Sequence, residues 1–218
     1  KHNHTSTILP HQLKNTTTQE TLNNVKIHRI PSFFSRYIFT FSSIPKAIQL
    51  ARKHDIIQTT TFNGAFPAWL AAKLTHKPVT LTVHEVWINR WQDITGFSKL
   101  KSFIHNTLEH AIYLLPFDHY ICVSNSTKSD LLKHKPKINQ TKITTIYNGL
   151  DYEFWNPKTI PEKEITKLKE KHNLIDKYNF LAYGRPGPSK GFEYLIHAFP
   201  KIKQEISNAH LTLIFGST

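Results

Sequence analysis

The sequence predicts an alternating α/β protein, in which parallel strands are joined by crossover helices. Short runs rich in Val, Ile, Thr and Tyr alternate along the chain with longer stretches whose apolar residues lie three or four positions apart. The chain has 218 residues, 39% of them hydrophobic, which is enough to bury one large core or two small ones. No sequence unit repeats at the spacing of about 20 to 50 residues that solenoid proteins show, so solenoid folds are excluded.

The expected strands are apolar or β-branched runs that end at polar or turn-forming residues. They are Val25–Ile30, Ile56–Thr60, Val79–His84, His119–Ser124, Ile143–Tyr147, Asn179–Gly184 and Leu211–Phe215. The expected helices place apolar residues on one face at helical spacing. They are Ile44–His54, Ala65–Thr75, Leu100–Leu115, Ser126–His134, Glu162–His172 and Phe192–Ile206. Ser124 has the residue type and the position of an N-cap for the helix that follows it.

Turn-forming residues near position 150 predict a boundary between two domains. Asn148-Gly149 supplies a turn, and Trp155-Asn156-Pro157 precedes a charged stretch. We therefore expect one domain over residues 1–150 and the first part of a second over 151–218. The first 24 residues are polar and rich in Thr and Asn, and we expect them to be poorly structured.

Net charge and cysteine content indicate which partners and which redox compartment suit the protein. The net charge of +13 is concentrated in residues 1–150, which hold 18 Lys and Arg against 7 Asp and Glu. Such a field attracts nucleic acid, anionic lipid or a phosphorylated substrate alike. The single cysteine, Cys122, lies in an apolar run and excludes an internal disulfide, which fits a reducing compartment. No apolar run approaches the roughly 20 residues that span a bilayer.

Two apolar segments allow two interpretations. One is the aromatic run from Phe33 to Phe41, and the other is a helix face bordered by lysines and histidines. The face comprises Phe97, Leu100, Phe103, Ile104, Leu108 and Ile112. Packing in the core is the simpler interpretation and the one that we expect. Docking on an anionic membrane is the alternative.

The segment from Phe180 to Phe192 is an apolar strand, a Gly- and Pro-rich loop and the start of a helix. Such a loop suits an anion, because helix N-terminal N–H groups favour negative charge, and Arg185 and Lys190 add two cations. Gly184, Gly187 and Gly191 would let the backbone approach a ligand closely. The spacing fits neither the dinucleotide fingerprint nor a Walker loop. Taken alone, the segment is more simply interpreted as a solvated turn between a strand and a helix.

Four segments in sequence order together resemble the retaining GT-B glycosyltransferases of the group-one, or family four, type. They are Thr82-Val83-His84-Glu85; Ile121-Cys122-Val123-Ser124; Lys142 to Asp151, continuing to Phe154 and Pro157; and Gly184-Arg185 with Lys190-Gly191. This resemblance covers about two thirds of the chain and implies a fold of two Rossmann-like domains, the first nearly complete and the second only begun.

The resemblance implies that a nucleoside diphosphate sugar is the donor substrate. Arg185 and Lys190 would hold its diphosphate, with Gly184, Gly191 and Gly216 beside it, so that the cations stabilise the leaving group. His84 would lie near the transferred sugar and either bind a hydroxyl or assist proton transfer. Without the resemblance, a surface or packing role would be the simpler account of this histidine. We expect no cofactor and no metal, because no Asp-x-Asp or clustered ligand set is present.

Two elements of the family pattern have no counterpart between Lys1 and Thr218. They are the Gly-rich loop of the first domain and the paired glutamates of the second, so we expect a chain truncated at both ends and inactive alone. The expected acceptor is a carbohydrate or a lipid-linked molecule, and the expected location is the cytoplasm, with peripheral contact at the inner face of the membrane. A non-catalytic binding module with the same fold is the alternative; nucleic-acid binding is not expected, because no readable motif supports it.

Overall fold

The computed structural model describes residues 4–31 and 35–216. The chain divides into two compact units, each described by itself below. The first comprises Lys1–Ile88 and Phe103–Asn148, and the second comprises Asn89–Ser102 and Gly149–Thr218. The α/β class expected from the sequence is confirmed, and every expected strand and helix is present with ends shifted by at most a few residues.

The first unit is built on a four-stranded parallel sheet with the strand order β4-β5-β6-β7. The strands are β4 (Ile57–Thr60), β5 (Val79–Val83), β6 (His119–Cys122) and β7 (Ile143–Thr145). The helices connected to them are α2 (Ile44–Ala51), α3 (Ala65–Thr75), α5 (Lys99–Ile112) and α6 (Asn125–His134), of which α5 begins in the second unit and enters the first at Phe103. Because the strands are parallel and adjacent in sequence order, their carboxyl ends lie along one edge of the sheet, where parallel α/β sheets carry their ligands.

The core of this unit lies on the two central strands. Val79, Leu81 and Val83 of β5 are fully buried, and β6 contributes Tyr120 and Cys122. The side chain of Cys122 is a free thiol, as expected, and burial raises its pKa to about 11. A thiol in this state is protonated at neutral pH and unreactive while it stays buried.

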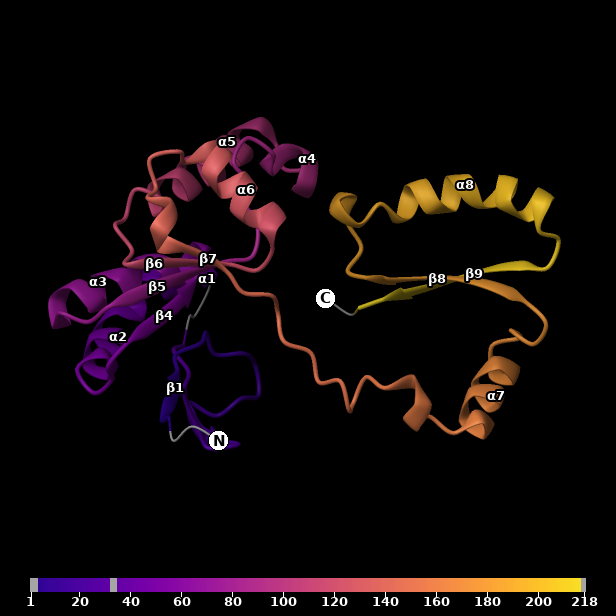
Figure 1. Ribbon diagram of the computed structural model, residues 1–218, viewed down its shortest axis with the longest axis horizontal. Helices are drawn as coiled ribbons and strands as arrows, with labels where there is room; N and C mark the ends of the chain where they lie inside the picture. The colour runs from indigo at the N-terminus through magenta and orange to yellow at the C-terminus, as the bar shows by residue number, and fades with distance from the viewer. Residues whose placement is uncertain (1–3, 32–34, 217–218) are drawn as a thin grey trace. The chain divides into compact units, whose positions relative to one another are not determined.

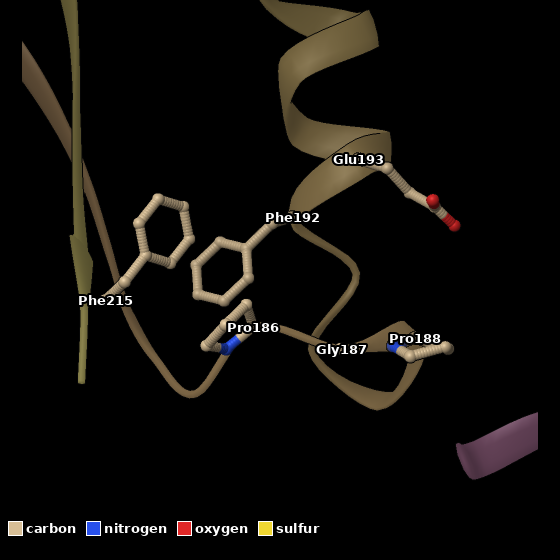
Figure 2. Close-up of a pocket in the computed structure, with 6 residues that line it drawn as sticks. All are labelled: Pro186, Gly187, Pro188, Phe192, Glu193 and Phe215. Carbon is tan, nitrogen blue, oxygen red and sulfur yellow. The ribbon is translucent and has the colours of Figure 1, made fainter. Parts of the chain in front are cut away.

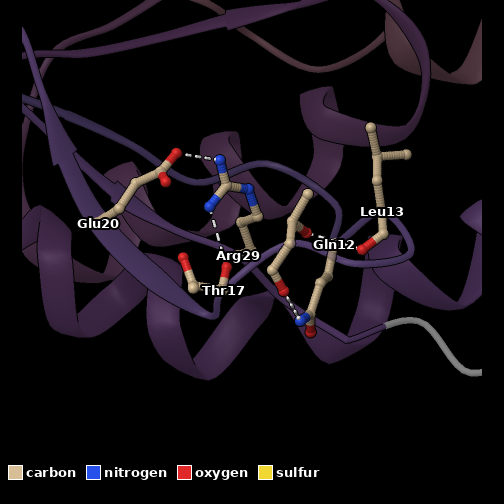
Figure 3. Close-up of polar contacts among 6 residues, drawn as sticks. Gln12, Leu13, Thr17, Glu20 and Arg29 are labelled. Atoms are coloured by element: carbon tan, nitrogen blue, oxygen red, sulfur yellow. Dashed lines mark hydrogen bonds and ion pairs between the residues drawn. The ribbon is translucent and has the colours of Figure 1, made fainter.

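The N-terminal part of the chain is more ordered than we expected. The prediction of a poorly structured stretch over the first 24 residues is wrong for those described, since β1 (Ser6–Ile8) and β2 (Gln19–Leu22) flank β3 (Val25–His28) in a three-stranded sheet. Arg29 pairs with Glu20 and donates to the Thr17 carbonyl at 2.9 Å (Figure 3). Backbone pairing and this polar contact order strands that bury little apolar surface.

Two helices were not expected from the sequence. α1 (Arg36–Ser42) occupies the described part of the aromatic run, of which Phe33 and Phe34 lie outside the described residues. The side chain of Ser35 caps it by accepting from the Tyr37 N–H. α4 (Trp91–Thr95) is a short helix that ends at Gly96 in the left-handed conformation. No helix among the described residues has both the length and the apolarity required to cross a bilayer.

The second unit carries the Gly- and Pro-rich loop. Its elements are α7 (Glu162–Lys171), β8 (Tyr178–Gly184), the short 3-10 helix η4 (Pro188–Lys190), α8 (Phe192–Glu205) and β9 (Ala209–Phe215). β8 and β9 pair in parallel from Tyr178↔Ala209 to Gly184↔Phe215. Figure 1 shows α8 running alongside this pair. The loop therefore leaves the carboxyl end of β8 and leads directly into the N-terminus of α8.

Candidate functional site

The predicted site residues fall in both units. His84 belongs to the first unit, whereas Gly184, Arg185, Lys190, Gly191 and Gly216 belong to the second. Each group lies at the carboxyl end of parallel strands.

His84 directly follows β5 and its side chain is exposed. Its backbone carbonyl accepts a hydrogen bond from Thr127 Oγ1 at 3.3 Å. The strand before it is held on both sides, since the Val83 carbonyl accepts from the Val123 N–H and the Thr82 carbonyl accepts from the Thr61 N–H. The backbone of His84 is thus fixed by its neighbours, and its imidazole is available to solvent and ligands.

Thr127 is held by the N-cap of α6. Ser124 Oγ accepts from the Thr127 N–H at 3.0 Å and lies 2.9 Å from Thr127 Oγ1. This confirms the expected role of Ser124 as the N-cap. One capping serine therefore orders both the first turn of α6 and, through Thr127, the carbonyl of His84.

Glu109 supports the segment after His84, and the sequence analysis missed it. This α5 carboxylate is 1% exposed, and its Oε1 accepts from the Trp87 N–H at 2.9 Å. Burial and then the nearby Glu109 carboxylate raise the pKa of the Tyr113 phenol. Its position gave no local signal: Glu109 stands seven residues after Ser102, on the same side of the helix, and only the fold shows that this side is buried.

Strained backbone marks the end of the neighbouring strand. Phe62 begins the short 3-10 helix η1 (Phe62–Gly64) after β4 and has a φ of 73°. A bulky residue rarely takes this conformation, and such strain is common near functional sites. Its ring centroid lies 6.1 Å from that of Trp87. Two aromatic side chains therefore meet on the sheet edge from which His84 emerges.

The loop of the second unit depends on its glycines. Gly187 has a φ of 154° and Gly191 a φ of 64°, where a residue with a Cβ is strained. Gly191 stands at the N-cap of α8, where no side chain makes a capping hydrogen bond. The first turn of this 14-residue helix therefore lacks a side-chain acceptor from the cap.

Arg185 and Lys190 lie at the carboxyl ends of the paired strands β8 and β9. A Cβ placed on Gly184 would be 3.8 Å from Lys190 Cδ and Cε, and one on Gly216 would be 3.9 Å from Arg185 Cγ. The Gly216 N–H donates to the Gly184 carbonyl at 3.1 Å, which joins the two glycines. Both cationic side chains are exposed, and neither forms an ion pair with another described residue.

A pocket of about 300 Å³ adjoins the loop. It is lined by Pro186, Gly187, Pro188, Phe192, Glu193 and Phe215. Figure 2 shows the rings of Phe192 and Phe215 side by side above Pro186, while Glu193 points away from them. The two ring centroids lie 4.9 Å apart in a T-shaped arrangement. The loop thus combines an apolar wall with two cations and a helix N-terminus, a combination that suits an anionic group attached to a flat or apolar one.

The described residues contain no group of three or more His, Cys, Asp or Glu side chains placed to hold a metal ion.

The first unit is a parallel sheet with crossover helices, and the second carries a strand, a cationic loop and a helix. These features define an α/β protein of the GT-B type, with Rossmann-like architecture. The chain belongs to Glycosyltransferase Family 4, whose sequence profile matches residues 1–154. The family expected from the four motifs is therefore confirmed. A search of curated protein sequences gave no match.

Solved structures establish the same fold. Anabaena Alr3699/HepE in complex with UDP-glucose superposes with a TM-score of 0.65 at 15% identity, covering 87% of this chain and 47% of that one. A glycosyltransferase from Rickettsia africae gives 0.54 at 16% identity, covering 88% and 55%. A putative UDP-N-acetylglucosamine 2-epimerase from Listeria monocytogenes gives 0.51 at 14% identity, covering 88% and 48%. The chain spans about half the length of these proteins, and at such identity the likeness concerns the fold alone.

Proposed function

We propose that this chain is part of an enzyme that transfers a sugar from a nucleoside diphosphate sugar to an acceptor hydroxyl with retention of anomeric configuration. One observation carries the proposal: Arg185 and Lys190 lie beside Gly184 and Gly216, at the carboxyl end of two parallel strands and next to a helix N-terminus. Family membership supports transfer as the reaction, and the UDP-glucose bound to Alr3699/HepE supports this class of donor.

In the proposed reaction the acceptor oxygen attacks the anomeric carbon from the side of the leaving group. The bond between that carbon and the diphosphate oxygen breaks, its electron pair stays on the diphosphate, and the acceptor proton passes to the same oxygen. Arg185 and Lys190 oppose the negative charge that develops there, so they stabilise the transition state more than the ground state. With these cations in place, we propose that the transfer needs no metal ion.

His84 is the proposed contribution of the first unit. The carbonyl of His84 is held by a hydrogen bond, and its imidazole is exposed. Such an imidazole can form a hydrogen bond with a sugar hydroxyl or assist proton transfer. The lone buried thiol is consistent with the reducing cytoplasm, where we place the enzyme.

Calorimetric titration of the full-length enzyme of which this chain is proposed to be part, with a panel of nucleoside diphosphate sugars, tests the donor site. We expect saturable binding by at least one donor, and a loss of at least about 100-fold in affinity in Arg185→Ala/Lys190→Ala, since hydrogen bonds to charged groups contribute about 1.5–3 kcal/mol each. The matched control is Lys169→Ala/Lys171→Ala on α7, which removes the same charge from the same unit. Equal affinity in the two double variants, or no binding by the folded protein to any donor, would contradict the proposal and favour a non-catalytic module.

A further inference from the structure

Two aromatic side chains stand on the sheet edge of the first unit that carries His84, which we call the carboxyl edge because β4 to β7 end there. Phe62 follows β4 and Trp87 lies in the segment after β5. Their ring centroids are 6.1 Å apart, and the ring planes are tilted by 53°. Both side chains are partly exposed, whereas Val83, at the end of β5, is fully buried. The pair therefore presents aromatic surface to solvent.

The fold holds both rings in place. The left-handed φ of Phe62 is one that a bulky residue adopts only where the surrounding structure imposes it. The residue before it, Thr61, is tied to β5, because its N–H donates to the Thr82 carbonyl at 3.3 Å. The Trp87 N–H is held in turn by the buried Glu109 carboxylate. Little order is therefore lost when a ligand packs against the two rings.

Polar side chains continue along the carboxyl edge. Asn125, the first residue of α6, is exposed, and its Nδ2 donates to Tyr147 Oη at 3.2 Å. Tyr147 follows β7 and is 67% exposed. Two residues after Asn125, Thr127 donates to the His84 carbonyl, so the same helix turn is tied to His84. An imidazole, an amide and a phenol thus reach solvent after β5, β6 and β7.

This set of groups matches the chemistry of a pyranose ring. The C–H groups on one face of such a ring are attracted to the negative face of an aromatic side chain. The hydroxyls around its rim both donate and accept hydrogen bonds, as the polar groups of the edge do. An acyl chain would use the rings but leave the polar groups without partners. A phosphate would be opposed by the carboxylate of Glu85, which is exposed directly after His84.

We propose that the acceptor is a carbohydrate whose sugar ring packs on Phe62 and Trp87 while its hydroxyls bind His84 and Asn125. The inference rests on the proposed sugar transfer for calling this ligand the acceptor. Its chemical class rests on the aromatic pair and on the polar groups beside it. Phe62 and Trp87 are then binding residues that favour a sugar over a lipid as the acceptor.

Saturation-transfer difference NMR of the full-length enzyme tests the site without any donor. The probes are the methyl α-pyranosides of glucose, galactose, mannose and N-acetylglucosamine, with dihexanoyl phosphatidylglycerol as a soluble lipid. We expect saturation of the ring C–H protons of at least one glycoside, strongest on the face that meets the aromatic rings, and none of the lipid. Glycoside binding without donor binding would leave a carbohydrate site and contradict the transfer. Donor binding without glycoside binding would overturn this inference alone.

Variants that remove one ring each locate the site. Phe62→Asn, which tolerates the left-handed conformation, and Trp87→Leu should each weaken glycoside binding about 5-fold, whereas Trp87→Phe keeps a ring and should retain most of it. Circular dichroism of each variant verifies the fold.

Phe103→Leu is the matched control, since it removes an exposed ring from α5 in the same unit. Phe103 is 67% exposed, contrary to the core packing that we expected for its helix face, because α5 turns Glu109 inward instead. This variant should bind the glycosides as the unaltered protein does. Equal weakening in Phe103→Leu, full binding by Phe62→Asn and Trp87→Leu, or saturation of the lipid in place of the glycosides would each overturn the proposal.

Discussion

At the scale of single residues, Glu109 is a buried side chain that holds the backbone segment following the proposed site residue His84. Its carboxylate is buried and accepts from the backbone three residues after His84. A buried carboxylate is costly unless its hydrogen-bonding capacity is used, and here it orders a segment that leaves the sheet edge. We infer that Glu109 positions this segment and does not itself contact substrate.

Replacing Glu109 by Ala should lower the free energy of unfolding by about 2 kcal/mol, because the Trp87 N–H would lose this acceptor in a partly buried setting. Urea unfolding followed by circular dichroism measures the loss. Glu109→Gln keeps an acceptor oxygen and serves as the control, for which we expect a clearly smaller change. Equal losses in the two variants would contradict the hydrogen bond as the cause.

Arg185, Lys190 and His84 were identified in the sequence, whereas Glu109 and Phe62 were not. The cations belong to a Gly- and Pro-rich loop, a local pattern that is visible in the chain itself. The importance of Glu109 depends on which side of α5 faces inward, and the φ of Phe62 depends on the packing after β4. Both are tertiary properties, which local sequence patterns do not determine.

At the scale of secondary structure, the N-terminus of α6 joins two strands of the sheet. Ser124 ends the segment after β6 and caps α6, and Thr127 of the first turn binds the carbonyl that follows β5. A change in this cap should therefore affect both a helix and the backbone of His84.

Ser124→Ala should destabilise the first unit by about 1 kcal/mol, the usual loss when an N-cap hydroxyl is removed. Thermal unfolding followed by circular dichroism measures this. Ser124→Asp retains a capping oxygen and should restore most of the stability, whereas equal loss in both variants would mean that the cap contributes little.

β5, which the sequence predicted, and β2, which it did not predict, differ in burial. β5 alternates Val, Leu and Val with Thr and is buried over nearly its whole length, so its pattern is strong. β2 is Gln-Glu-Thr-Leu and is exposed at every position, so it carries no apolar alternation. Such a strand is ordered by backbone pairing to β3, and no local sequence pattern indicates this pairing.

At the scale of the whole molecule, the segment that enters the second unit at Gly149 is open to solvent. Tyr152 is 80% exposed, Phe154 74% and Trp155 65%. Exposed segments between compact units are the preferred sites of proteolysis.

Brief treatment with chymotrypsin should therefore cut first after Tyr152, Phe154 or Trp155, and mass spectrometry of the two fragments would locate the cut. Phe103 is comparably exposed but lies within α5, where the backbone is held by helical hydrogen bonds, so it serves as an internal control. An initial cut at Phe103 would contradict the prediction and indicate that α5 opens more readily than the connecting segment.

The burial of Cys122 makes β6 an internal reporter of the stability of the sheet. Because no other thiol exists in the chain, a thiol-specific reagent can react at one position only, and that position is closed in the folded state. The labelling rate then measures how often the centre of the sheet opens, and its dependence on urea separates local fluctuation from global unfolding. Opening of the sheet can therefore be followed by thiol-labelling kinetics without introducing a cysteine.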